Sequence, residues 1–216
     1  MALYATHLRF AHELVPFLEI KDLSAYYSGV TYPDSRNMTK LERHKTHDLE
    51  SLRDPFKKEL DDFSKGWAIH NLYDEKSEDF YVKTAPWPDE ELMAPNRLWL
   101  YTTAEKVVED QISFNILGQT LPLIIKKIVC PAKSPNDEDH QLLENFYSLM
   151  IKSYQRRSLL TFEDYQGIFI GCGSSSEMVK KIAEFTEQIM AEPEKVRQIT
   201  GFYDRILKSV LEKYQV

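Results

Sequence analysis

The sequence predicts an all-α fold: a single helical domain over residues 1–216, built as a bundle of about seven or eight helices. Apolar residues recur at intervals of three and four along most of the chain, which is the spacing of helices with one buried face. No segment shows the strict apolar–polar alternation of a half-buried strand. A length of 216 residues with 43% hydrophobic residues suits one compact domain.

The first helix is indicated by residues that would share one face: Leu3, His7, Phe10, Leu14 and Phe17. Pro16 limits how far this helix continues. Asp22 is expected to cap a short second helix. Gly29 is then expected to start an irregular segment, and residues 36–54 a charged loop with one or two helical turns.

A long helix is predicted over residues 55–81 from an apolar stripe that two polar residues continue. The stripe consists of Phe63, Trp67, His70 and Asp74. A proline-rich segment, residues 86–95, predicts a loop after it. Thr102 and Glu105 have the spacing of a capping box, so a further helix is expected from there to about Phe114.

The next elements are also predicted to be helical. The apolar run over residues 121–129 is expected to form a short helix rather than a strand. Asn136 or Asp137 is then expected to cap a helix over residues 138–157.

The C-terminal part is predicted to contain two amphipathic helices. Residues 167–173 are expected to form an irregular apolar turn, after which Ser174 and Glu177 have capping-box spacing. The final helix covers residues 196–211. Its apolar stripe is compatible with an oligomer interface, although packing on the core explains it better.

Composition excludes several classes of protein. The formal net charge of −7 argues against an extensive nucleic-acid-binding surface. Two cysteines are too few for a disulfide framework or a zinc finger. Charged residues and histidines interrupt the first twenty positions, so no export signal is expected, and no apolar run is long enough to span a membrane. We therefore expect a cytoplasmic protein.

The histidines are concentrated near the start of the chain, where five of the six lie within the first 70 residues. His7 lies on an apolar helical face and is either a core histidine or a metal ligand. His70 and Asp74 are four residues apart, so both side chains can reach one ion from the same face of a helix. The alternative is a hydrogen-bonded His–Asp pair at the edge of the core.

Two further candidates lie between these segments. Asp34 follows Pro33 and is either a turn or cap residue or a rigidly aimed carboxylate. His47 lies in the segment 43–48, which is either a solvated loop or a source of ligands. Together with His7, His70 and Asp74 they form a nitrogen and carboxylate set that suits zinc, iron or manganese. Five ligands exceed one closed tetrahedral zinc site, which favours a cluster of two or three ions.

The order of these residues resembles the zinc-dependent phospholipase C superfamily, which also contains single-strand-specific nucleases. The similar elements are Thr6-His7-Leu8, Pro33-Asp34, Thr46-His47 and the stretch from Gly66 to Asp74. The resemblance covers about residues 4–75 and implies an all-α fold around a zinc cluster held by these five side chains. It also suggests His140 and Glu144 as further ligands, with the family's His-x-x-x-Glu spacing. The family's additional histidine has no counterpart between His70 and His140.

The resemblance implies a metal-dependent hydrolase that acts on a small phosphoester. In this interpretation metal ions polarise a phosphoryl oxygen and activate water, Asp74 bridges two ions, and Asp34 is a ligand or the base that orients the water. Tyr32, Arg36 and Arg43 lie close in sequence and are candidates for phosphate contact.

Two alternative functions stay open at this point. A phosphohydrolase of the HD-domain type would use His12, the pair His47-Asp48 and a later aspartate such as Asp110. A non-catalytic helical module that keeps a partial metal site is the second alternative.

Overall fold

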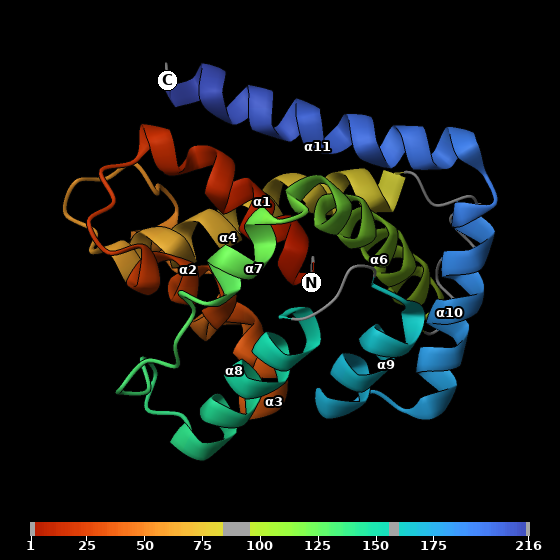
Figure 1. Cartoon of the computed structure of the whole chain (residues 1–216), viewed down its shortest axis with the longest axis horizontal. Coiled ribbons are helices and arrows are strands. Elements are labelled where there is room, and N and C mark those ends of the chain that lie inside the picture. Colours follow the sequence, from red (N-terminus) through yellow and green to blue (C-terminus); the bar gives the residue numbers. More distant parts are fainter. Residues whose placement is uncertain (1–2, 84–95, 156–159, 215–216) are drawn as a thin grey trace.

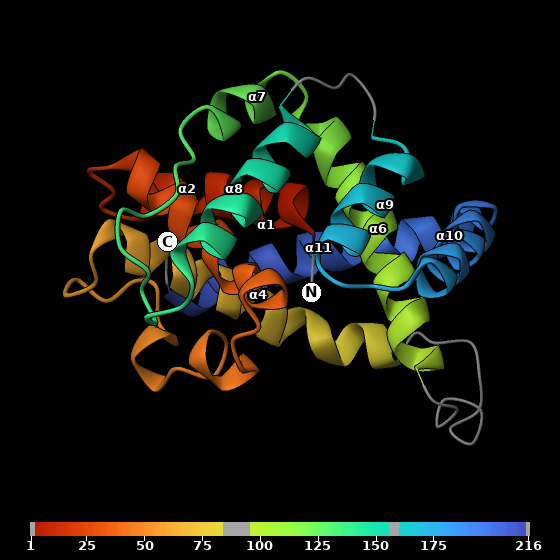
Figure 2. The ribbon, with the colours of Figure 1, turned by 90° about the horizontal axis from the view of Figure 1, so that it is seen from below.

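The computed structural model describes residues 3–83, 96–155 and 160–214 (Figures 1 and 2). The described residues form helices and contain no strand, so the predicted all-α fold is confirmed. The α-helices are α1 (Tyr4–Leu14), α2 (Leu23–Thr31), α3 (Arg36–Thr39), α4 (Asp62–Lys83), α6 (Arg97–Leu117), α7 (Thr120–Ile125), α8 (His140–Tyr154), α9 (Phe162–Gly171), α10 (Ser176–Met190) and α11 (Pro193–Tyr214). Short 3-10 turns are η1 (Val15–Phe17), η2 (Tyr32–Ser35), η3 (Arg43–Lys45) and η4 (Glu50–Leu52). The predicted proline loop lies largely outside the described residues.

Helix α1 lies in the middle of the molecule. Figure 1 shows α1, α4 and α6 between α11 on one side and α3, α8 and α9 on the other, and Figure 2 shows α8 and α9 in front of α1 when seen from below. Every residue from Tyr4 to Ala11 is buried, so α1 has no solvent face over this stretch. The buried apolar side chains form one continuous core around it. No helix within the described ranges is both long and apolar enough to cross a membrane.

Helices α2 and α4 cross at very short range through two glycines. A Cβ atom on Gly66 would lie 2.0 Å from the Tyr26 carbonyl oxygen, and one on Gly29 would lie 2.0 Å from the Phe63 carbonyl oxygen. Gly29 therefore does not begin an irregular segment as predicted. It lies inside α2, which continues to Thr31, because the absent side chain lets the two helix backbones touch.

Two helices begin elsewhere than predicted. Helix α4 starts at Asp62 rather than near residue 55, because the Asp61 carboxylate accepts a hydrogen bond from the Ser64 N–H at 2.7 Å and so caps its first turn. Helix α6 starts at Arg97, so Thr102 is not its cap. The Thr102 hydroxyl instead donates to a backbone carbonyl oxygen three residues earlier, as a helix-interior threonine does.

The segment 167–173, predicted as an irregular turn, is mostly the second half of α9. That helix starts with a capping box in which the Thr161 and Asp164 side chains bond each other's backbone N–H groups, a signal that the sequence contains. Two caps are also displaced by one or more residues. Asp139 caps α8 in place of Asn136 or Asp137, and Ser175 caps α10 in place of Ser174. Asp137 has a left-handed backbone, with φ of 57°, and so lies outside the helix.

The glycine crossing predicts a strong and position-specific effect of alanine. Gly66→Ala places a methyl group against the Tyr26 backbone, so we expect a loss of about 2 to 3 kcal/mol or more in the free energy of unfolding. Gly167→Ala is the matched control, because nothing lies within 4 Å of its added Cβ and alanine is the better helix former. Urea denaturation of both variants measures the difference, and equal stabilities would contradict the close crossing.

Candidate metal centre

Five side chains from four segments converge beside the α2–α4 crossing. His7 comes from α1, Asp34 from η2, His47 from the turn that follows η3, and His70 and Asp74 from α4. Two groups have ligand atoms that all lie within 4.8 Å of one another: His7, His70 and Asp74, and Asp34, His47 and His70. The structure thus brings together the five residues that the sequence singled out.

The Asp74 carboxylate faces three imidazole rings. Its Oδ1 lies 3.4 Å from Nε2 of His7, and its Oδ2 lies 3.5 Å from Nε2 of His47 and 3.7 Å from Nε2 of His70. These separations are longer than ordinary hydrogen bonds. Two ligand atoms that each lie about 2.0–2.1 Å from one tetrahedral zinc ion are roughly 3.3–3.4 Å apart. The spacing is therefore closer to that of atoms sharing an ion than to that of atoms sharing a proton.

Two of the imidazole rings are oriented by hydrogen bonds on the side away from Asp74. His70 Nδ1 lies 2.8 Å from the Val30 carbonyl oxygen, and His47 Nδ1 lies 2.8 Å from the Thr46 hydroxyl. A carbonyl oxygen can only accept, so Nδ1 of His70 carries the proton and Nε2 carries the lone pair. Burial and the neighbouring His7 hold the pKa of His70 well below its usual value, which keeps the ring neutral. A neutral ring with a free Nε2 is the form that binds a metal ion.

His7 and Asp34 are buried without hydrogen-bond partners among the described residues. His7 stacks on His70 with ring centroids 3.7 Å apart, and both of its ring nitrogens lack a hydrogen bond. Both carboxylate oxygens of Asp34 are likewise buried and unbonded, and burial raises its pKa. Leaving such groups unpaired in a protein interior is costly. A cation bound between them would supply the missing partner.

The pKa of Asp74 is shifted downwards, opposite to that of Asp34, which fits a cluster of mixed charge. Burial alone raises the pKa of Asp74, but opposing contributions, among them those of His47 and His7, outweigh it and leave the pKa well below its usual range. Asp74 is therefore ionised at neutral pH, as a ligand must be.

The geometry also decides between the interpretations that the sequence left open. His70 and Asp74 are not a hydrogen-bonded pair, since their closest charged atoms are 3.7 Å apart. His47 is not part of a solvated loop, because its side chain is only 2% exposed. Asp34 caps no helix with its side chain, which has no hydrogen-bond partner in the described part of the chain.

His140 and Glu144 are not brought to this cluster. They lie 3.7 Å apart on the exposed first turns of α8, and neither belongs to the two groups. Their predicted spacing on one helical face is correct, but that face points to solvent. The ligand pair suggested by the resemblance is therefore not assembled here.

The residues of the HD-type alternative are engaged elsewhere. His12 Nδ1 lies 2.9 Å from the Tyr27 hydroxyl, and Asp48 is exposed. The Asp110 carboxylate accepts hydrogen bonds from the Tyr154 and Tyr165 hydroxyls and from a backbone N–H of α1. None of these three joins His47 in a group of candidate ligands.

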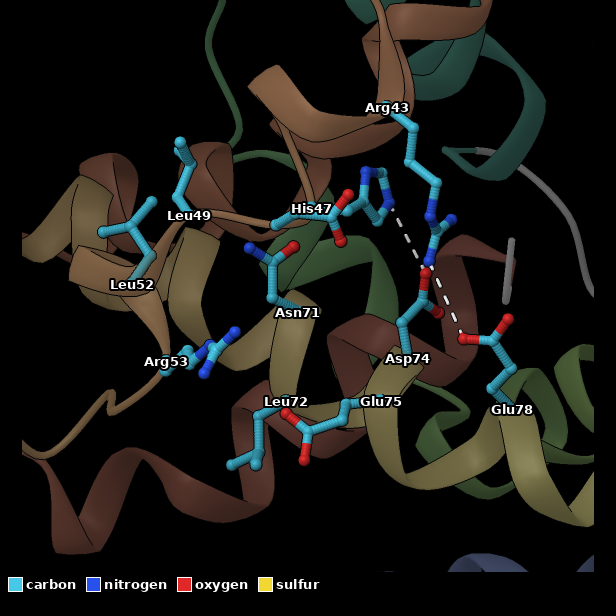
Figure 3. Close-up of a pocket in the computed structure, with 11 residues that line it drawn as sticks. Arg43, His47, Leu49, Leu52, Arg53, Asn71, Leu72, Asp74, Glu75 and Glu78 are labelled. Atoms are coloured by element: carbon cyan, nitrogen blue, oxygen red, sulfur yellow. Dashed lines mark ion pairs between the residues drawn. The ribbon is translucent and has the colours of Figure 1, made fainter.

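Two cavities open onto the cluster, and several of their residues were not anticipated from the sequence. One, of about 340 Å³, is lined in part by His47, Asn71, Asp74 and Glu78 (Figure 3). The other, of about 350 Å³, reaches Asp74 from a second direction and includes Trp99. Two of these residues could have been predicted from helical spacing. Asn71 is three residues before Asp74 and Glu78 is four residues after it, so both lie on the same helical face as Asp74.

We expect the cluster to bind zinc at or above one ion per chain. His70→Ala should abolish this binding, because His70 belongs to both groups of ligand atoms. His140→Ala is the matched control and should retain the metal, since His140 lies outside both groups. Elemental analysis after zinc loading and removal of free ion gives the measurement. Metal-free wild-type protein would contradict the assignment.

Asp34→Asn should stabilise the metal-free protein and weaken the effect of metal. Because burial raises the folded-state pKa of Asp34, its ionisation lowers stability as the pH rises through that pKa, and the neutral amide avoids this cost. We expect a gain of about 1 to 3 kcal/mol in chelator at neutral pH. Zinc should then raise the melting temperature of the wild type more than that of the variant. A variant less stable than wild type in chelator would contradict the view that Asp34 is buried unpaired.

Comparison with known proteins provides no independent support for a metal centre. No family model, no curated protein and no solved structure matches the chain. The resemblance to the zinc-dependent phospholipase C superfamily stays a prediction, and the case for a metal centre rests on the five convergent side chains.

Proposed function

We propose that this protein is a metal-dependent hydrolase of phosphoric esters whose divalent ions are held by His7, Asp34, His47, His70 and Asp74. The observation that carries the proposal is the convergence of these side chains, whose ligand atoms lie within 4.8 Å of one another in two groups beside a cavity that Asp74 lines. Among the described residues, His7 and Asp34 are buried in these groups without a hydrogen bond. Zinc suits this set of imidazoles and carboxylates best, with iron and manganese as alternatives.

The geometry supports two ions rather than one. The two Asp74 oxygens face different histidines, Oδ1 toward His7 and Oδ2 toward His47 and His70. His70 can contribute to only one ion, because its Nδ1 is committed to the Val30 carbonyl. Asp74 would hold both ions, with His7 at one of its oxygens and His47 and His70 at the other.

Divalent ions in such a site polarise a phosphoryl oxygen and lower the pKa of a bound water towards about 7. The chain itself supplies the geometry of the reaction. Asp74 lines the cavity and so lies where the substrate phosphorus has to approach. Asp34 lies deeper and is fully buried, which suits a ligand or a carboxylate that holds and orients a water molecule.

The cysteines, rather than the site, support a proposal for the compartment. Cys130 and Cys172 are both free and half-buried. Free thiols persist in a reducing environment, so we propose the cytoplasm as the place of action.

A hydrolysis assay tests the proposed function. The zinc-loaded protein should hydrolyse a p-nitrophenyl phosphomonoester or phosphodiester, and Asp34→Asn should lower kcat by about 100-fold or more when compared at equal zinc content. His140→Ala should leave kcat unchanged. Zinc bound without turnover on either ester would contradict a hydrolase and favour a non-catalytic module that uses the metal to stabilise its fold.

A further inference from the structure

Arg43 lies at the junction of the two cavities. Three residues line both of them, Arg43, Asp74 and Glu78. Figure 3 shows the Arg43 side chain extending past His47 toward the carboxylates of Asp74 and Glu78. Arg43 therefore borders both of the cavities through which a ligand can reach Asp74.

Hydrogen bonds connect the backbone of Arg43 to that of His47, a candidate metal ligand. Its carbonyl oxygen accepts hydrogen bonds from the backbone N–H groups of His47, at 2.8 Å, and of Thr46, at 3.0 Å. The Thr46 hydroxyl donates to the same oxygen at 3.3 Å and lies 2.8 Å from Nδ1 of His47. This hydrogen-bonded turn therefore fixes the position of the Arg43 Cα atom relative to the His47 ring.

The guanidinium group, in contrast, is held loosely. Its ion pair with Glu78 has an Nη2–Oε2 distance of 3.9 Å, and the two side chains are 43% and 70% exposed. A pair of this length between exposed groups contributes little to stability. The planar guanidinium therefore keeps donors that can form two parallel hydrogen bonds to an oxyanion.

We propose that Arg43 binds the phosphoryl oxygens of the substrate and that Glu78 holds its guanidinium over the site until the substrate replaces the carboxylate. The inference rests on the proposed function, because it takes the phosphoryl group to lie beside Asp74. A phosphate can accept two parallel hydrogen bonds from arginine, whereas the Arg43–Glu78 contact is a single 3.9 Å ion pair, so the exchange replaces a weak contact with a stronger one.

Arg53 provides the matched comparison. It lines only the first cavity, is 65% exposed and has its Nη1 2.9 Å from Oε2 of Glu50. Arg53→Ala removes the same charge from the same cavity without removing a group at Asp74. The two alanine variants therefore separate direct contact from the general effect of charge.

The experiment compares zinc-loaded wild type with Arg43→Ala, Arg43→Lys, Glu78→Gln and Arg53→Ala. Arg43→Ala should lower kcat/KM for a p-nitrophenyl phosphoester by about 10- to 100-fold and weaken inhibition by inorganic phosphate by a similar factor, with zinc content unchanged. Arg43→Lys should recover part of the loss. Glu78→Gln should strengthen phosphate inhibition, because the competing carboxylate is gone, and Arg53→Ala should change either quantity by less than about threefold.

Other results would overturn the inference. Equal losses in the two alanine variants would show that charge alone acts, and an unchanged Arg43→Ala would show that Arg43 makes no contact. Wild type that binds zinc but hydrolyses neither ester refutes the proposed function alone, and calorimetric binding of inorganic phosphate to zinc-loaded wild type and Arg43→Ala then decides the role of Arg43. Wild type that binds no zinc refutes both.

Discussion

The close crossing of α2 and α4 is the packing constraint on which the candidate site depends. Because Gly29 and Gly66 let the two backbones touch, the Val30 carbonyl reaches Nδ1 of His70 at 2.8 Å. The orientation of His70 is then set by the main chain of a neighbouring helix rather than by a mobile side chain. Helix α2 also leads directly into η2, which holds Asp34. A single contact between helices therefore helps to position His70 on α4 and Asp34 in η2.

The unpaired groups of the site stand out because other buried acids in this core have partners. Glu109 accepts hydrogen bonds from the Tyr73 and Tyr81 hydroxyls, and Asp110 from those of two further tyrosines. Burial still raises their pKa values, to about 7 and about 6, but each carboxylate is hydrogen-bonded. His7 and Asp34 lie in the same interior, and no described residue offers them such a hydroxyl. A core that provides hydrogen bonds to Glu109 and Asp110 but not to His7 and Asp34 is best explained by a ligand that binds the latter two. Binding of a metal ion there would couple metal affinity to folding stability.

The sequence predicts the helical fold and the His70–Asp74 pair because both depend on local spacing, whereas His7, Asp34 and His47 are singled out by residue type and by the order of residues in the resemblance. Apolar periodicity identifies α1 and α4, and the four-residue step from His70 to Asp74 places both on one face. Where several segments must meet, spacing fails. From the sequence, Gly29 is expected to break the helix, whereas in the structure it is the residue at which α2 contacts the Phe63 backbone. His140 and Glu144 have the same four-residue step as His70 and Asp74, yet their face points to solvent, and only the packing of the helix distinguishes the two cases.

The charges around the first cavity set a condition on the anionic substrate that we propose. Its wall carries four carboxylates, Asp48, Asp74, Glu75 and Glu78, against two guanidinium groups, Arg43 and Arg53. Without bound ions this wall is net negative and repels a phosphate group. Two divalent ions at the cluster would reverse the sign beside Asp74 and favour an oxyanion there. The affinities for phosphate and for metal would then be linked: a phosphoester in the cavity would raise the affinity for the ions by the same factor as the ions raise the affinity for the ester.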